Sequence, residues 1–234
     1  MPPPPATLLF RDQRFVVIDK PAGLPVHPGP SGGHSAEDWF PLLSRRRDGP
    51  WLVHRLDADT AGCLVIALRK TALLAAQALF ASGAVRKTYW AVVRGEVAGA
   101  SGSVTMPLRR VSDRGGWRIV ADPAGQTAVT DWRVLGRGAG LTWLSLHPRT
   151  GRTHQIRVHC ASLGHPILGD AHYGSPGGGL HLLARSIHLP LDPPVDATAE
   201  PPPHMHAALA RCGFPRSAHG EAKPSSSSLA RSIT

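Results

Sequence analysis

The chain has 234 residues, of which 42% are hydrophobic and 18% charged, so it is long and apolar enough for a large folded core and is not a disordered protein. Its formal net charge of +10 points to a polyanionic partner, with nucleic acid first and an anionic membrane surface second. No apolar run approaches the length of a membrane span, and the start, MPPPPATLLF, lacks the pattern of a signal peptide.

The positive charge belongs to the main part of the chain rather than to a tail. Residues 191–214 carry a net charge of −2 and residues 215–234 a net charge of +2, so the whole +10 lies in residues 1–190. A basic folded domain favours nucleic-acid binding, and the alternative is that the charge only aids solubility. The three cysteines are far apart and lack CxxC spacing, which indicates a reducing compartment and a cytoplasmic location.

Hydrophobic patterning predicts the elements in chain order. Residues 1–6 are rich in proline and are expected to be loose. Strands are expected at RFVVIDKP, WLVHRLD, CLVIALRK, VRKTYWAVVRGEV, WRIVAD, TAVTDWRVLGR, LTWLSLHP and LHLLARSIHLPL. A first helix, TALLAAQALFAS, is expected to end at Gly83. A second, THQIRVHCASLG, is expected to be capped by Thr153, to bury Ile156, Cys160 and Leu163 on one face, and to end at Gly164.

Strands outnumber helices and occur in adjacent runs. This arrangement predicts an α+β fold with a mixed or mainly antiparallel sheet, rather than a doubly wound parallel sheet. A proline-rich segment crosses residues 191–203, and the chain ends in the low-complexity stretch SSSSLARSIT. Residues 215–234 are therefore expected to form a disordered tail.

A basic cluster, HPRTGRTHQIRVH, covers residues 147–159 and has a glycine turn that leads into the second helix. Free N–H groups at such a turn, together with arginine side chains, suit a phosphate backbone, and the alternative is a solvated basic face. His154 and His159 are five residues apart, which puts them on different faces of a helix, and no HExxH is present, so no metal site is expected. A serine hydrolase is poorly supported because GxSxG is absent.

The stretch VHRLDADTAG, residues 53–62, combines charged residues with the start of a hydrophobic run. Asp59 is best explained as a turn former whose side chain bonds its own backbone. Asp57 follows an arginine and a histidine at the end of a strand-like run, so it is a candidate nucleophile or base that Arg55 would help to keep ionised.

Four motifs in order resemble the RluA-type RNA pseudouridine synthases. HRLDADTAG resembles the nucleophile motif HRLDxxTSG, with Ala61 where serine is usual. VVIDKPAGLPVHPG, RKTYWAVVRGEV and HPRTGRTHQIRVHCASLGHPILGDAHYG are similar to the other motifs of that family, and the set spans roughly residues 14–190. The resemblance implies a pseudouridine synthase catalytic domain over residues 7–214, with a mixed, mainly antiparallel sheet in two halves, flanked by helices, around a basic cleft. It leaves no room for an N-terminal S4 module.

The resemblance also implies roles for single residues. Asp57 corresponds to the catalytic aspartate, Tyr89 to the tyrosine that packs on the flipped base, and Arg157 to the basic residue that pairs with the aspartate. Arg55 corresponds to the arginine that enters the RNA stack when the uridine leaves. The other expected RNA contacts are His54, Thr60, Arg152, Thr153 and His154.

The implied reaction breaks the N1–C1′ bond of uridine and joins C5 to C1′. It involves no redox change, so no cofactor is expected. The expected partner is ribosomal or transfer RNA, with the uridine in a loop or single-stranded region that is cheap to unstack, and the protein is expected to act as a monomer away from membranes. The alternative is a non-catalytic RNA-binding or ribosome-assembly factor with the same fold. The presence of Asp57, Tyr89 and Arg157 together argues against a decayed site.

Overall fold

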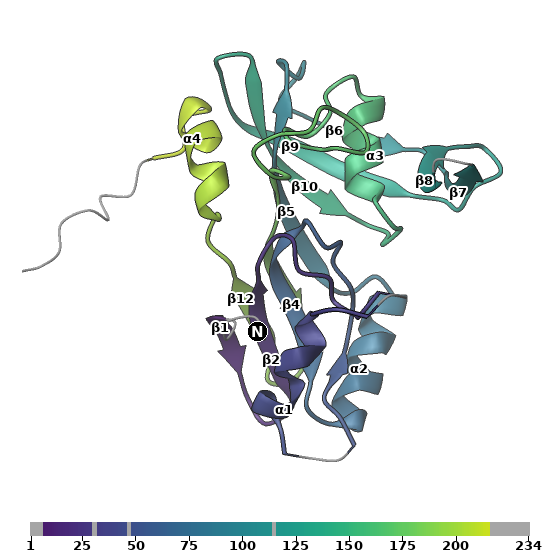
Figure 1. The fold of residues 1–234 in the computed structure, drawn as a ribbon, viewed down its shortest axis with the longest axis vertical. Helices are drawn as coiled ribbons and strands as arrows, with labels where there is room; N and C mark the ends of the chain where they lie inside the picture. Colours follow the sequence, from purple (N-terminus) through teal and green to yellow (C-terminus); the bar gives the residue numbers. More distant parts are fainter. Residues whose placement is uncertain (1–6, 30–31, 46–47, 114–115, 216–234) are drawn as a thin grey trace, which may run out of the picture.

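The structure is a computed structural model that describes residues 7–29, 32–45, 48–113 and 116–215 (Figure 1). The segments expected to be loose, residues 1–6 and 216–234, lie outside the described residues. The helices are the 3-10 helix η1 (Ala36–Trp39), α1 (Phe40–Leu43), α2 (Lys70–Ala81), α3 (Gln155–Ser162) and α4 (Pro203–Arg211). The strands are β1 (Thr7–Arg11), β2 (Phe15–Lys20), β3 (Trp51–Leu52), β4 (Ala61–Ala67), β5 (Arg86–Arg94), β6 (Ser101–Thr105), β7 (Leu108–Asp113), β8 (Gly116–Ala121), β9 (Val129–Gly138), β10 (Leu141–Pro148), β11 (Leu182–Leu189) and β12 (Val195–Thr198).

A ten-stranded sheet runs through the molecule in the order β1-β2-β4-β11-β5-β10-β9-β6, with β12 beside β11 and β3 beside β4. β11 and β4 run parallel, and the other pairs within the described residues are antiparallel. Strands β7 and β8 form a separate hairpin. The expected α+β fold with a mixed, mainly antiparallel sheet is confirmed.

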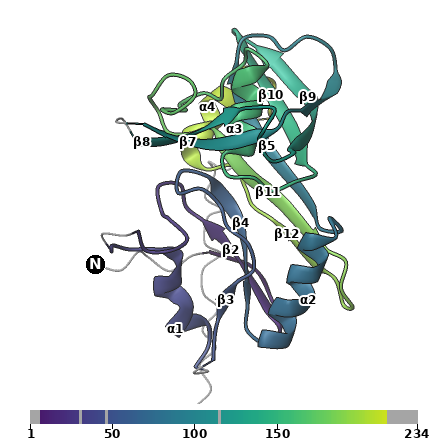
Figure 2. The same cartoon turned by 90° about the vertical axis from the view of Figure 1, so that its right-hand side faces the viewer.

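The sheet has two halves, each with its own covering helices (Figures 1 and 2). The first half carries β1, β2 and β4 with η1, α1 and α2, and the second carries β9, β10 and β6 with α3 and the β7–β8 hairpin. Side chains alternate across β2, so Phe15 and Val17 enter the core beneath α2 and α4, while Val16 and Ile18 pack beneath η1 and α1. None of the helices in the described ranges is long and apolar enough to cross a membrane.

The two halves meet where β11 inserts between β4 and β5. Gly62 has a φ of +107°, and a Cβ atom there would overlap the carbonyl oxygen of Ala184 on β11, so this close approach requires glycine. Ala61 stands beside it, opposite Leu183, and is buried in the apolar core. The loop that carries Asp57 therefore leads into the junction between the halves.

The segment WLVHRLD is not the strand expected over 51–57. Only β3 pairs with β4, and the chain then turns, with the Thr60 N–H donating to the Asp57 carbonyl at 3.1 Å. Where a longer β3 would offer a backbone carbonyl, the Val65 N–H of β4 donates instead to Nε2 of the His54 ring at 3.1 Å. Arg55 and Asp57 therefore lie on a loop and not on a strand.

The expected cap of the second helix is also wrong. Residue 154, not Thr153, precedes the first turn of α3, and it is in the left-handed region with no capping bond from its side chain. Gln155 organises the turn instead, since its Oε1 accepts from the Thr150 hydroxyl at 2.7 Å and from the Arg152 N–H at 3.0 Å. Leu163 lies beyond the helix and is 36% exposed, whereas the expected stop at Gly164 has a φ of +83°.

Candidate active site

A cavity of about 370 Å³ lies at the junction between the two halves of the sheet. Its walls come from the loop after β3, from β5, and from the segment that connects β10 to α3. All nine site residues predicted from sequence line it: His54, Arg55, Asp57, Thr60, Tyr89, Arg152, Thr153, His154 and Arg157. The fold thus brings together side chains that lie as far as 103 positions apart in the sequence, from 54 to 157.

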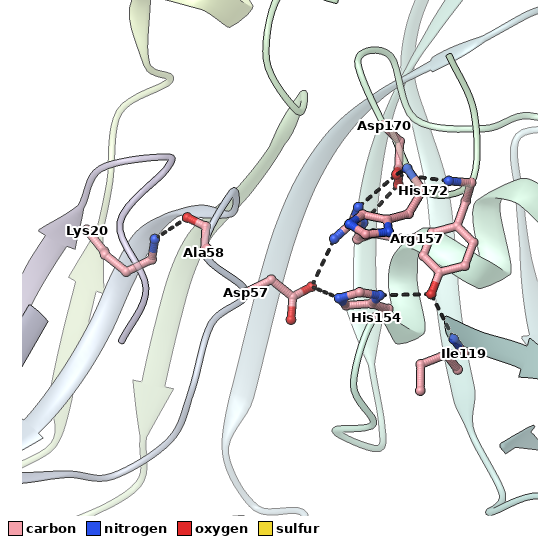
Figure 3. Close-up of polar contacts among 9 residues, drawn as sticks. Lys20, Asp57, Ala58, Ile119, His154, Arg157, Asp170 and His172 are labelled. Carbon is pink, nitrogen blue, oxygen red and sulfur yellow. Dashed lines mark hydrogen bonds and ion pairs between the residues drawn. The ribbon is translucent and has the colours of Figure 1, made fainter. Parts of the chain in front are cut away.

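Asp57 faces the second half of the molecule from the loop between β3 and β4 (Figure 3). Its Oδ2 lies 3.7 Å from Nη1 of Arg157 and 3.9 Å from Nε2 of His154. Among the described residues, no other cationic or imidazole nitrogen lies within 4 Å of the carboxylate, and no donor forms a hydrogen bond with it. With 22% of its side chain exposed, Asp57 remains accessible to a substrate in the cavity.

Arg157 is held on α3 by a partner that the sequence did not reveal. Its Nε and Nη2 donate to the two carboxylate oxygens of Asp170 at 2.9 and 2.8 Å, and both side chains are buried. Burial alone would raise the pKa of Asp170. The bonds from Arg157 and from the N–H groups of His172 and Tyr173 outweigh it and lower that pKa. The bidentate bond leaves Nη1 free to face Asp57.

Tyr89 lies on β5, between Leu146 of β10 and Ala184 of β11. It is half-buried, and desolvation, reinforced by the charge of Asp57, raises the pKa of its hydroxyl, which stays protonated near neutral pH. A neutral aromatic ring in the cavity wall suits stacking against a base.

Lys20 holds the backbone of the loop that carries Asp57. This fully buried side chain donates from Nζ to the carbonyls of Pro21, Leu24 and Ala58 at 2.7–2.8 Å. Figure 3 shows the bond to Ala58. Desolvation lowers its pKa to about 8, an effect that the charges of Asp59 and Asp57 partly oppose. Because Ala58 follows Asp57 directly, the ammonium group fixes the backbone beside the candidate nucleophile.

The predicted RNA contacts differ in exposure. Arg55, Arg152 and Thr153 are exposed, so they are available to a ligand. His54 is half-buried and stacked on Phe80, with ring centroids 5.2 Å apart. Thr60 is buried at the back of the turn.

Lys87 is a site residue that sequence reasoning missed, although it lies in RKTYW two positions before Tyr89. Burial lowers the pKa of its ammonium group. Among the described residues its recorded contact is the ring of Phe80, 5.9 Å away, with no hydrogen bond or ion pair. Lys87 lines both the cavity and a larger groove of about 1,100 Å³. A desolvated cation without a partner at this place suits an anionic ligand.

Open space also continues on the other side of the cavity. A recess of about 440 Å³ shares Arg55, Arg152 and Thr153 with it and is lined by Arg109, Arg110 and Trp117 of the β7–β8 hairpin. Within the part of the chain that the structure describes, no three His, Cys, Asp or Glu side chains are grouped so as to hold a metal ion.

Known proteins that resemble this chain in sequence and known proteins that resemble it in structure belong to the same class. The sequence model of the family described as RNA pseudouridylate synthase matches residues 14–162. An RNA pseudouridine synthase of Zymomonas mobilis, named as uncharacterized, is 43% identical over 171 residues, which cover 72% of this chain and 78% of the relative. The ribosomal large subunit pseudouridine synthase D of the same organism is 36% identical over 193 residues, which cover 78% of this chain and 60% of the relative.

The structural neighbour human RNA pseudouridylate synthase domain containing 4 superposes with a TM-score of 0.74 at 30% identity, covering 88% of this chain and 92% of that one. Human RNA pseudouridylate synthase domain containing 1 superposes with a TM-score of 0.72 at 27% identity, covering 87% of each chain.

Proposed function

This chain belongs to the RNA pseudouridylate synthase family, the isomerases that convert uridine in RNA to pseudouridine, and we propose that it does so with Asp57 as its catalytic aspartate. One observation carries the proposal: the nine residues predicted from sequence line one cavity, in which Asp57 faces Arg157 and His154 across the junction of the two halves. We also assign residues 7–214 to one catalytic domain, since β11 and β12 complete the sheet that holds the site.

The geometry fits a rearrangement at a flipped nucleotide. The reaction breaks N1–C1′, turns the uracil and forms C5–C1′, while C5 loses a proton and N1 gains one. The Asp57 carboxylate either attacks C1′ or takes a proton from the sugar, and both routes need an ionised oxygen within reach of the ribose. The Nη1 of Arg157, 3.7 Å away, supports that charge, and Tyr89 offers a ring for the detached base.

The charges on either side of the cavity support a path for the RNA strand. The groove that contains Lys87 opens on one side, and the recess beneath Arg109, Arg110 and Trp117 opens on the other. We propose that the flipped uridine enters the cavity between them, with Lys87 meeting a phosphate of the adjoining strand and Arg55 entering the gap that the uridine leaves.

We propose ribosomal RNA as the substrate and a single chain as the active unit. The first rests on the relative named as a ribosomal large subunit synthase, and the second on the fact that one chain supplies every wall of the cavity. A map of pseudouridines in total RNA with and without the protein tests the substrate. If only a pseudouridine in transfer RNA were lost without the protein, transfer RNA would replace ribosomal RNA as the proposed substrate.

The catalytic assignment is tested by Asp57→Asn. The change keeps the shape of the side chain and removes its charge, so the single-turnover rate should fall by at least about a thousandfold while RNA affinity changes little. Release of tritium from 5-tritiated uridine in RNA measures the reaction, because C5 must lose its hydrogen. Release at the wild-type rate would remove Asp57 from the mechanism, and a wild-type protein that binds RNA without release would be a non-catalytic binding factor.

A further inference from the structure

A chain of polar contacts leads from the β7–β8 hairpin to the Asp57 carboxylate (Figure 3). The N–H of Ile119 in β8 donates to the hydroxyl oxygen of Tyr173 at 3.1 Å. That oxygen lies 2.8 Å from Nδ1 of His154, and Nε2 of the same ring lies 3.9 Å from Oδ2 of Asp57. The His154 ring therefore lies between Tyr173, which bonds to the hairpin, and Asp57, the candidate nucleophile.

These contacts favour one of the two tautomers of the neutral His154 ring. The Tyr173 oxygen accepts from Ile119, and its own proton must go to an acceptor. Nδ1 of His154 is the acceptor that the described residues offer at hydrogen-bond distance. If Tyr173 donates to Nδ1, the ring's N–H lies on Nε2 and points towards Asp57.

The charged surroundings of His154 favour this neutral form. Desolvation lowers the pKa of His154, Asp57 opposes that effect, and Arg157 and His172 add to it. The titratable or charged groups that face the ring are Asp57, Arg157, Asp170, His172 and Tyr173. A neutral imidazole has a single N–H, so its position decides whether Asp57 meets a donor or a lone pair.

The backbone and packing of His154 hold the ring in this place. The residue has a φ of +53°, in the left-handed region that costs a non-glycine residue free energy and that recurs at functional sites. Its ring packs against Trp117 of the hairpin, with centroids 5.1 Å apart, and edge-on against Tyr173, with centroids 5.5 Å apart. The side chain is only 9% exposed, so rotation would break both contacts.

We propose that His154 is a positioning residue that presents its Nε2–H to the Asp57 carboxylate, and that the β7–β8 hairpin sets this donor through Tyr173. The proposal builds on the proposed function, because Asp57 is taken as the catalytic aspartate. The 3.9 Å separation closes to a hydrogen bond when the substrate fills the cavity, as catalytic contacts often tighten on binding. RNA that contacts Trp117 on the hairpin thereby orients the carboxylate.

The first test reads the proton directly and needs no catalysis. The ¹⁵N chemical shifts of the His154 ring in the free wild-type protein should report the Nε2–H tautomer at neutral pH. In Tyr173→Phe, which lacks the donor, the same shifts should report a mixture or the Nδ1–H form. An Nδ1–H ring in the wild type would overturn the proposal even if Asp57 proved essential. Because the free protein is used, a failure of the proposed enzyme activity leaves this result readable.

The second test uses His154→Asn. Asparagine tolerates the left-handed backbone but is too short to reach Asp57. The single-turnover rate should fall about tenfold to a hundredfold, while the Kd for RNA stays within about twofold. The matched control is His165→Asn at the far end of α3, where the ring contacts the Arg94 carbonyl and should leave the rate unchanged. A wild-type rate in His154→Asn would overturn the positioning role.

A pH profile separates positioning from a merely structural role. The Tyr173 hydroxyl donates to the neutral ring, so Tyr173→Phe should raise the pKa of His154. The acid limb of the single-turnover rate should then move towards neutral pH, because a charged imidazole holds the Asp57 carboxylate too tightly. A lower rate with an unmoved acid limb would overturn the link through Tyr173, and the wild-type tautomer remains decisive if the variant fails to fold.

Discussion

The two walls of the cavity are built in opposite ways. On one wall, Asp57 stands on a turn, with its nearest charged neighbour 3.7 Å away and no hydrogen bond to its carboxylate among the described residues. On the other, Arg157 and Asp170 are buried and joined by two bonds shorter than 3.0 Å. Within the described residues, the first wall leaves the Asp57 oxygens without a hydrogen bond, while the second fixes the positive charge that faces them.

This difference is what the proposed mechanism requires, in which the Asp57 carboxylate reacts and Arg157 orients it. A carboxylate already engaged in short bonds would be a poor nucleophile or base, whereas a guanidinium that moved would give its field no fixed direction. Lys20 extends the principle beneath the turn, where it holds the Ala58 carbonyl and leaves the neighbouring carboxylate alone. If the walls differ in this way, stability should depend on the buried pair of Arg157 and Asp170, and reactivity towards RNA on the turn that carries Asp57.

The largest effect should come from breaking the buried pair. Asp170→Asn leaves the Arg157 charge buried without its counterion, so the free energy of unfolding should fall by about 3–5 kcal/mol. Urea unfolding followed by circular dichroism measures it. Asp57→Asn is the matched control on the open wall and should change stability by less than about 0.5 kcal/mol. Similar losses in both variants would contradict the division between the walls.

The next effect concerns how stability depends on pH through His54, which lines the cavity near Asp57. Desolvation, together with the charge of Lys87, lowers its pKa to about 4 in the folded protein, against 6.5 for the free side chain. Between these values the unfolded chain binds the extra proton, so stability should fall as the pH drops from 6.5 to 4, by roughly 2.5 kcal/mol. His54→Gln keeps an acceptor for the Val65 N–H and should flatten this slope in urea titrations at several pH values. An unchanged slope would mean that other groups cause the acid sensitivity.

A smaller effect should distinguish base flipping from chemistry. Arg55 is exposed beside the cavity, so Arg55→Ala should slow reaction about tenfold on a folded stem-loop and much less on a short unstructured oligonucleotide with the same uridine. Arg157→Lys weakens the fixed wall and should slow both substrates alike. Single-turnover rates of both variants on both RNAs make the comparison. Equal losses for Arg55→Ala would make Arg55 an ordinary phosphate contact.

The smallest effect is expected at Lys87. If its ammonium group meets one phosphate, Lys87→Met should weaken RNA binding a few-fold and reduce the slope of log affinity against log salt by about 0.7. Lys70→Met, an exposed lysine at the start of α2, is the control and should leave the slope unchanged. A slope that Lys87→Met does not alter would exclude this phosphate contact.

Much of the sheet was predictable because its strands have a strong local signal. FVVIDK is rich in β-branched residues, LTWLSLHP is rich in leucine, and both are short and largely buried. Helix α4 was not predicted, because its segment is rich in proline, although prolines are tolerated in the first turn of a helix. Its Met205 and Leu209 are fully buried in the core. Strands β1, β6, β7 and β12 and the η1–α1 segment were also not predicted, since short edge elements owe their form to their neighbours.

The members of the site were predictable and its supports were not. Motif order was enough to name the nine residues around the cavity, although their individual roles remain predictions. Nothing in the local sequence says that Asp170 neutralises Arg157, because that pairing depends on how the turn after α3 folds back. The signal was the GDAHYG turn itself, in which Asp170 and Tyr173 were visible without an assigned function.

The position of β11 has a consequence for the newly made protein. Asp57 precedes β4 and Tyr89 lies on β5, but these strands do not touch; β11, residues 182–189, is the strand that joins them. At roughly 5–20 residues per second, the ribosome finishes β11 several seconds after Tyr89. Until then the nascent chain lacks Leu182, which lines the cavity, and the strand that joins β4 to β5. The cavity that holds the candidate catalytic aspartate can therefore be complete only after β11 has been made, late in the synthesis of the described residues.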